Sequence, residues 1–162
     1  MTRLGILSDT HIDRPTDSFR SVVEAAFLNV DMVIHAGDMT GVEVYEYLSQ
    51  WNLRAVRGNM DCQELRVILP EKRVEEVEGK RIGVVHGYGS PYGLESFACN
   101  QFAEVDIVVF GHSHMPLYTK LGKTVLFNPG SLRKPHNPPG TVGIIEIING
   151  DAVFKHVNVA YP

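Results

Sequence analysis

Two histidines follow a run of apolar residues in the stretch VDIVVFGHSHMP, residues 105–116. The run from Ile107 to Phe110 predicts a buried strand, and His112 and His114 come directly after its end. A single histidine in such a place is more often part of a turn than of a site. The other strand ends therefore decide whether these two imidazoles could do chemistry.

Side chains of the kinds that bind metals follow four further predicted strands in the same way. Each of these strands ends beside a glycine or another small residue. Ligands of open α/β sheets bind beyond the carboxyl ends of the strands, where loops distant in sequence meet. Carboxylate oxygens and imidazole nitrogens suit Mn, Fe, Co, Ni or Zn, so the repetition favours a transition-metal site over five coincidental turns. The candidate donors are Asp9, His11, Asp38, Asn59, His86, His112 and His114.

The elements that would carry these donors alternate between strand and helix in the first half of the chain. Apolar residues at helical spacing predict a helix at 18–29, for which Asp17 or Ser18 supplies the N-cap. A β-α-β-α-β order is typical of a parallel sheet with crossover helices. The predicted order is a strand at 3–7, this helix, a strand in DMVIHAGD, a helix at 42–50 and a strand in LRAVRGN.

The second half of the chain predicts hairpins instead. A helix is expected around 91–103, and the Pro- and Gly-rich stretch 128–140 reads as a surface loop. The predicted hairpin turns lie near Gly79, at 121–123 and at 149–151. We therefore expect an α/β fold in which two packed mixed β-sheets are flanked by helices, in a single domain spanning 1–162.

Composition and charge limit the classes of function. The chain has 162 residues and a net charge of −4, from 15 lysines and arginines against 19 aspartates and glutamates, which argues against an extended nucleic-acid surface. No apolar stretch approaches the roughly 20 residues that span a bilayer, and the N-terminus lacks the run of a signal peptide. The two cysteines give no disulfide framework. We expect a cytoplasmic protein without a membrane partner. The sequence does not distinguish a monomer from a homo-oligomer.

Five short motifs carry a family resemblance. They are SDTHID, HAGD, RGNMD, VVHGYG and GHSH, and in this order they resemble the metallophosphoesterase motifs D-x-H, G-D, G-N, H and G-H-x-H. With NPGS at 128–131, the pattern is similar to the small YfcE-like phosphodiesterases of the calcineurin-like superfamily over residues 1 to about 157. The resemblance implies the four-layer sandwich of that family and a hydrolase that acts on a small phosphoester substrate, foremost a phosphodiester.

The resemblance also implies a dinuclear metal site. Two divalent transition-metal ions are the expected cofactors, Mn first and Ni, Fe, Co or Zn as alternatives. Hydrolysis is expected through attack of a hydroxide bound to both metals, with Asp38, Asn59 and His86 as catalytic residues. The implied ligands are Asp9, His11 and His114 for the first metal, Asn59, His86 and His112 for the second, and Asp38 as the bridge.

Two positions depart from the family pattern. Met60 stands where many relatives have a histidine that protonates the leaving group, and Tyr88 stands where relatives often have a second histidine. The loss of that acid predicts slow release of a basic alkoxide, because general acid catalysis contributes about 10²–10⁴-fold. Tyr88 is expected to form a wall of the pocket.

Four further residues are candidates for contact with the substrate or with the ligands. Asn128 follows a strand end, where it either supports the ligands or builds a turn. Arg133 either contacts phosphate or belongs to a solvated loop, and Arg57 either supports its loop or reaches substrate. Asp61 either orients a metal-bound histidine or caps a helix, and we favour the cap.

Three histidines lie outside the motifs. His35 alternates with core residues and is expected to be hydrogen-bonded in the core or behind the ligands. His136 and His156 have no partners in sequence and are expected on the surface.

Two other functions stay open. The first is a phosphomonoesterase or nucleotide hydrolase of the same superfamily, which the methionine at position 60 disfavours. The second is a non-catalytic scaffold, because the resemblance extends to a retromer subunit that uses this fold for protein contacts. The complete set of seven donors favours an enzyme over the scaffold.

Overall fold

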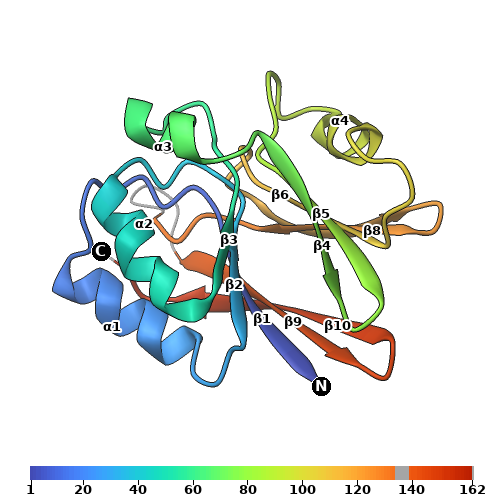
Figure 1. Cartoon of the computed structure of the whole chain (residues 1–162), viewed down its shortest axis with the longest axis horizontal. Helices are drawn as coiled ribbons and strands as arrows, with labels where there is room; N and C mark the ends of the chain where they lie inside the picture. Colours follow the sequence, from blue (N-terminus) through green and yellow to red (C-terminus); the bar gives the residue numbers. More distant parts are fainter. Residues whose placement is uncertain (134–138, 162) are drawn as a thin grey trace.

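The strands form two mixed five-stranded sheets (Figure 1). The computed structural model describes residues 1–133 and 139–161. β1, β2 and β3 are parallel, and β9 pairs antiparallel with both β1 and β10. The first sheet has the order β10 (Asp151–Val159), β9 (Gly140–Ile148), β1 (Thr2–Leu7), β2 (Met32–His35) and β3 (Leu53–Ala55).

The second sheet has three parallel strands at its centre. β5, β6 and β8 run parallel, and the hairpin partners β4 and β7 pair antiparallel at the two edges. Its order is β4 (Lys72–Val77), β5 (Lys80–Val85), β6 (Ile107–Phe110), β8 (Thr124–Pro129) and β7 (Pro116–Leu121).

Helices cover the outer face of each sheet, so the described residues form four layers (Figure 1). α1 (Asp17–Ala26), α2 (Val42–Leu48) and the 3₁₀ turn η1 (Ser49–Trp51) cover the first sheet. α4 (Leu94–Asn100) covers the second sheet, and α3 (Gln63–Ile68) follows β3 at one end of the sandwich. The predicted α/β fold of two packed mixed sheets flanked by helices is confirmed.

The side chains of a central strand pack alternately into two hydrophobic cores, one on each face of the sheet. In β6, Ile107 and Val109 enter the core between the sheets, whereas Val108 and Phe110 pack against α4. Successive side chains of a strand point to opposite faces, so a strand covered on both sides needs a continuous apolar run. This is why the run before the GHSH motif contains no polar residue.

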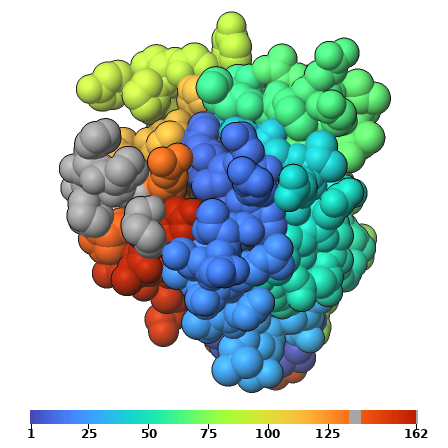
Figure 2. Space-filling model, turned by 90° about the vertical axis from the view of Figure 1, so that its left-hand side faces the viewer, coloured from blue at the N-terminus to red at the C-terminus, as the bar shows by residue number. Residues whose placement is uncertain are grey.

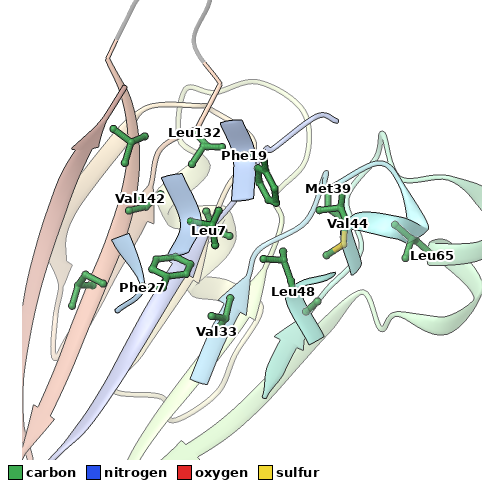
Figure 3. Packing of buried hydrophobic residues seen from close by; sticks show 14 of the residues in the cluster. Leu7, Phe19, Phe27, Val33, Met39, Val44, Leu48, Leu65, Leu132 and Val142 are labelled. Atoms are coloured by element: carbon green, nitrogen blue, oxygen red, sulfur yellow. The ribbon is translucent and has the colours of Figure 1, made fainter. Parts of the chain in front are cut away.

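The core beneath the helices of the first sheet also anchors the loops (Figure 3). Phe19 of α1 and Leu48 of α2 pack in one cluster with Leu7 at the end of β1. Met39 extends this cluster to the loop after β2, and Leu65 extends it to α3. Each of these side chains is fully buried. Burial of one such side chain contributes about 1.5–3 kcal/mol to the free energy of unfolding. The loops after β1 and β2 are thereby packed against the hydrophobic core of the first sheet.

The hairpins agree with the sequence predictions, whereas the helices differ in their ends. All three predicted hairpins are present. The first helix ends at Ala26, and its N-cap is Thr16, whose side chain accepts the Phe19 N–H, so the predicted caps Asp17 and Ser18 were wrong. The helix expected at 91–103 is confined to α4 because Gly93, with a φ of 75°, starts it late. The favoured cap at Asp61 implied a helix after it, but no bounds for α3 were predicted from the sequence.

The loop predicted at 128–140 starts later than expected. Asn128 and Pro129 belong to β8, where Asn128 faces Leu117 of β7. Residues 134–138 of this stretch, with His136, lie outside the described residues. In the part of the chain that is described, no helix is long and apolar enough to cross a membrane.

Candidate metal centre

The loops after β1, β2 and β6 meet at one end of the sandwich. The Asp9 N–H donates to the Gly37 carbonyl at 3.0 Å and the His11 N–H to the Asp38 carbonyl at 3.1 Å, which joins the first two loops. Across the two sheets, the His112 N–H donates to Asp9 Oδ2 at 3.0 Å. In Figure 2, the blue residues after β1 and the cyan residues after β2 lie side by side beneath α3 (green). Parallel strands thus bring distant polar residues to one edge.

The backbone at this edge is strained. Five of the seven candidate donors have positive φ angles, a region that residues other than glycine rarely adopt. Such strain costs about 1–3 kcal/mol per residue and clusters at functional sites. The fold therefore holds these side chains in an arrangement that local preference opposes. The angles are 54° at Asp9, 47° at His11, 59° at Asp38, 71° at His112 and 60° at His114.

Two motif glycines leave room for the carboxylates. A Cβ atom on Gly58 would overlap Asp38 Oδ1. A Cβ atom on Gly111 would overlap the Ser8 hydroxyl and would lie 2.7 Å from Asp9 Oδ2. Each glycine is needed because the backbone passes directly against a buried carboxylate. This packing gives a physical reason for the Gly-Asn and Gly-His pairs of the motifs.

Each buried carboxylate anchors a loop with one oxygen and presents the other to the centre. Asp9 Oδ2 accepts the Ser8 hydroxyl at 2.5 Å and the His112 N–H at 3.0 Å. Asp38 Oδ1 accepts the Met60 N–H at 2.8 Å. The remaining oxygens, Asp9 Oδ1 and Asp38 Oδ2, face only imidazoles within 4.0 Å among the described charged groups. The orientation of both carboxylates is thus fixed from the loop side.

The first group of donors consists of Asp9, His11 and His114. Asp9 Oδ1 lies 3.6 Å from His11 Nε2 and 3.2 Å from His114 Nε2, and the three atoms lie within 4.8 Å of one another. Asp9 Oδ1 and His11 Nε2 are buried and have no hydrogen-bond partner among the described residues. Buried polar atoms are normally paired, so two unpaired atoms aimed at one point fit a cation between them.

The second group consists of Asp9, Asp38 and His86. His86 Nε2 lies 3.2 Å from Asp38 Oδ2 and 3.8 Å from Asp9 Oδ1. His86 Nδ1 lies 2.7 Å from the Ala36 carbonyl, which only accepts, so Nδ1 carries a proton. The neutral ring would then direct the Nε2 lone pair at two carboxylates. Either a second proton or a metal ion removes that repulsion.

Asn59 and His112 lie beside His86, at the edge of the second group. Asn59 Oδ1 is 3.1 Å from His86 Nε2. The His112 ring is 5.3 Å from that of His86, and its Nε2 donates to the Gly89 carbonyl at 2.8 Å. This leaves Nδ1 of His112 as the atom available to a ligand. His112 belongs to neither of the two donor groups, so it would join the site from their edge.

The charges at the centre are coupled. Burial alone would raise the pKa of Asp9, but the imidazoles of His11 and His114 hold that pKa well below its usual range. Burial would also raise the pKa of Asp38, but the His86 imidazole and the Met60 N–H together lower it. Although burial again opposes the shift, the Asp38 carboxylate raises the pKa of His86. The Asp9 carboxylate, whose Oδ1 lies 3.2 Å from His114 Nε2, raises the pKa of His114. In the protein without metal, protons on imidazoles supply the positive charge that this site favours.

His35 lies behind the candidate ligands as a neutral imidazole. The Gly37 N–H donates to its Nδ1 at 3.1 Å, so Nε2 carries the proton and donates to Thr10 Oγ1 at 3.2 Å. Burial lowers the pKa of His35 to about 4. The predicted hydrogen-bonded core histidine is confirmed, and it links the loops that carry Asp9 and Asp38.

Asp61 ties the loop after β2 to the loop after β3. Its carboxylate accepts the N–H groups of Asp38 at 3.2 Å, Thr40 at 2.8 Å and Gly58 at 2.7 Å. The favoured interpretation of Asp61 as a helix cap was wrong, because the N-cap of α3 is Cys62. Asp61 therefore supports the backbone that presents Asp38.

Asn128 is buried and builds the GHSH loop. Its side-chain amide donates to the Gly111 carbonyl at 3.0 Å and to Ser113 Oγ at 3.1 Å, and its Oδ1 accepts the Gly130 N–H. His156 is half-buried, contrary to its expected exposure, because its ring stacks on Phe127 at 4.6 Å and contacts the Asn128 carbonyl.

Arg133 is exposed and lies over the loop after β1. Its Nη1 donates to the His11 carbonyl at 3.3 Å. The guanidinium therefore stands beside the first donor group without reaching its nitrogen and oxygen ligands.

A cleft of about 820 Å³ opens beside Asn59 and His86. Tyr88 forms part of its wall with 76% of its surface exposed, and Met60 is 58% exposed at the neighbouring loop. Arg66 of α3 also lines this cleft and donates to the Asn59 carbonyl. Sequence reasoning missed Arg66 because the helix implied after Asp61 was given neither bounds nor a position relative to the site.

Comparisons with known proteins identify similar chains. Residues 2–150 match the family model described as the calcineurin-like phosphoesterase superfamily domain. A probable metallophosphoesterase of Methanothermobacter thermautotrophicus is 32% identical over 147 residues, which are 89% of this chain and 85% of the relative. A phosphodiesterase of Methanocaldococcus jannaschii is 26% identical over 159 residues, covering 89% and 92%. The structure of Chaetomium thermophilum Vps29 covers 100% of both chains with a TM-score of 0.75 and 20% identity, which shows the shared fold.

Proposed function

The chain belongs to the calcineurin-like phosphoesterase superfamily, and from that premise we propose that it hydrolyses small phosphodiesters with two divalent transition-metal ions. The observation that carries the proposal is the convergence of five side chains at one point: Asp9, His11, Asp38, His86 and His114. Two of their atoms, Asp9 Oδ1 and His11 Nε2, are buried there without a hydrogen-bond partner among the described residues. The likeness to a relative named phosphodiesterase supports the substrate class.

The two donor groups suggest how the ligands are divided. We assign Asp9, His11 and His114 to the first ion and Asn59, His86 and His112 to the second. Asp38 is the proposed bridge, because its Oδ2 lies 3.5 Å from His11 Nε2 and 3.2 Å from His86 Nε2. We propose Mn²⁺ as the first choice of ion, since mixed oxygen and imidazole donors suit it.

Divalent ions at such a site activate water and neutralise charge on a phosphoryl group. The chain supplies two carboxylates and otherwise neutral donors, so two ions would leave net positive charge that favours an anionic phosphoester. The loop hydrogen bonds of Asp9 Oδ2 and Asp38 Oδ1 hold both carboxylates in place before substrate arrives.

Reconstitution of metal-stripped protein tests the proposal. Bis(4-nitrophenyl) phosphate should be hydrolysed after addition of Mn²⁺ and not before. Asp38→Asn should reduce turnover by more than about 100-fold, because loss of a ligand should exceed the roughly 10–100-fold cost of changing a residue behind a ligand. Asp151→Asn, at the exposed start of β10, is the matched control and should leave turnover unchanged. Full activity in Asp38→Asn, or none in the reconstituted parent, would contradict the proposal.

A non-catalytic scaffold is the second candidate, and exposed apolar residues near the site favour it. Val67 and Ile68 of α3 are 77% and 56% exposed, and Tyr92 and Met115 are 90% and 59% exposed. Exposed apolar surface of this kind is typical of protein contacts. Metal-loaded protein that hydrolyses neither the diester nor 4-nitrophenyl phosphate would favour the scaffold. Faster hydrolysis of the monoester would favour the monoesterase instead.

A further inference from the structure

The cleft beside the candidate metal centre extends well beyond the metal donors. Its volume of about 820 Å³ is lined by Asn59 and His86 from the centre and by residues of α3, β4 and α4. Pockets of roughly 300–1,000 Å³ accept whole small molecules. A phosphoryl group at the metal centre would therefore occupy only part of this space.

The remaining walls of the cleft are positively charged in a negatively charged protein. Arg57, Arg66 and Lys72 line it together with one carboxylate, Glu71, whereas the whole chain has a net charge of −4. Like charges gathered in one cleft raise the local concentration of a ligand of opposite sign. The distribution of charge thus favours an anionic ligand here more than elsewhere on the surface.

Arg57 has a structural partner, whereas the other two cations keep free donors. Arg57 donates to the Arg66 carbonyl at 2.8 Å and lies 3.8 Å from the Glu71 carboxylate. Arg66 and Lys72 have no carboxylate within 4.0 Å in the described part of the chain. A guanidinium has five N–H donors and an ammonium has three, so most of their hydrogen bonds remain available.

The backbone contacts of these two cations hold them at the cleft. Arg66 donates to the carbonyl of Asn59, the candidate ligand, and so stands next to the metal centre. Lys72 donates to the Gln101 carbonyl at 2.9 Å and lies 5.9 Å from the centre of the Phe102 ring. Arg66 is therefore held beside a candidate metal ligand, and Lys72 is held where β4 begins.

We propose that the substrate carries a second anionic group, a carboxylate or a phosphate, which binds to Arg66 and Lys72 in this cleft. The inference rests on the proposed phosphodiesterase function and specifies its substrate class. Tyr88 and the partly exposed Phe97 offer apolar walls for the carbon skeleton that joins the two anionic groups. A diester with only neutral substituents would leave both cations without a partner.

A series of synthetic diesters tests this inference. Each compound is a 4-nitrophenyl alkyl phosphate whose alkyl chain of two to six carbons ends in a methyl, a carboxylate or a phosphonate group. All have the same leaving group, so differences in kcat/KM report recognition of the chain end. Two exposed ion pairs together raise an affinity by roughly 2- to 30-fold, and we expect a preference of that size for one of the anionic ends. Comparison of the carboxylate and phosphonate ends identifies which anion fits.

Variants connect the preference to the cleft. Arg66→Gln and Lys72→Gln should each lower the ratio of kcat/KM for the anionic ester over the methyl-ended ester. Lys120→Gln removes the same charge from an exposed position of β7 and should leave the ratio unchanged. An equal loss of preference in Lys120→Gln would show an effect of overall charge and would overturn the inference.

The remaining outcomes separate the inference from the proposed function. Hydrolysis of the methyl-ended ester without any preference for an anionic end would overturn the inference and leave the function standing. If no ester is hydrolysed, the function fails, and calorimetric binding of 4-phosphonobutanoate against butylphosphonate still tests the cleft. Equal affinity for these two probes would overturn the inference as well.

Discussion

Asp9 and Asp38 share one arrangement at the scale of the residue. Each gives one carboxylate oxygen to backbone N–H groups of a neighbouring loop and leaves the other to imidazoles. Pre-oriented donors lose little freedom when a cation binds, so this arrangement favours affinity. The positive φ angles of both aspartates are the conformational cost of the same arrangement.

Asp9→Asn should weaken metal binding with little change in shape. The amide keeps an oxygen that can accept the His112 N–H, but it loses the charge that faces His11 and His114. We expect the dissociation constant for Mn²⁺, measured by calorimetric titration of metal-free protein, to rise by more than about 100-fold. Asp151→Asn serves again as the control. Unchanged affinity in Asp9→Asn would exclude Asp9 as a ligand.

Metal binding should release protons. The pKa values of His86 and His114 are raised above 6.5 by Asp38 and Asp9, so these imidazoles carry extra protons near neutral pH in the absence of metal. A metal ion must displace those protons, and its affinity should therefore rise with pH. Calorimetry in buffers of different ionisation enthalpy measures the number released. Affinity that does not change between about pH 6 and pH 8 would contradict this prediction.

At the scale of the element, the strand ends were predictable and the cleft was not. The runs before His86 and His112 are continuously apolar because both faces of β5 and β6 are covered, so their ends are visible in the sequence. α3 has six residues, and among its apolar residues Val67 and Ile68 are exposed. A helix with no regular apolar stripe gives no periodic signal.

The N-cap of α1 shows a second limit of sequence reasoning. Thr16, Asp17 and Ser18 are consecutive residues, and each has a side chain that can cap a helix. Only the backbone shows that the Thr16 side chain accepts the Phe19 N–H. The role of Asp61 was equally hidden, because its three N–H partners lie on two loops brought together by the parallel sheet.

Gly58→Ala should disturb the site through one element, the loop after β3. The added methyl group would overlap Asp38 Oδ1 and displace the proposed bridging carboxylate. We expect loss of most activity and of metal binding. Gly122→Ala is the control, because it meets no atom within 4 Å and its φ of 60° costs about 1–2 kcal/mol of stability without touching the site. Metal affinity equal to that of the parent in Gly58→Ala would contradict the proposed packing.

At the scale of the whole molecule, the site joins the two sheets. Asp9 follows a strand of the first sheet, and its carboxylate accepts the N–H of His112, which follows a strand of the second sheet. In the other direction, His86 follows a strand of the second sheet and contacts the Ala36 carbonyl after a strand of the first. In the protein without metal, the interactions of His86 and His114 with the carboxylates stabilise the fold. Their full contribution to the free energy of unfolding is present below pH 6.5, the ordinary pKa of histidine. That stability is lost as the pH rises through their raised pKa values.

Mn²⁺ should therefore stabilise the whole fold, most clearly above neutral pH. Binding at 100 times the dissociation constant contributes about 2.7 kcal/mol, and each kcal/mol shifts Tm by roughly 2–4 °C for a chain of this size. We expect a rise in Tm of about 5–10 °C from thermal melts at about pH 8.5. Asp38→Asn should lose most of the rise. An equal rise in that variant would place the stabilising ion elsewhere.

The proposed function depends on a pair of transition-metal ions that share Asp38. Crystals of the protein grown with Mn²⁺ allow the most direct measurement, an anomalous difference map recorded above and below the Mn absorption edge. We expect two peaks separated by about 3.5–4 Å, with the Asp38 carboxylate between them. One peak should lie beside His11 and His114, and the other beside His86 and Asn59. A single peak, or peaks away from Asp38, would contradict it.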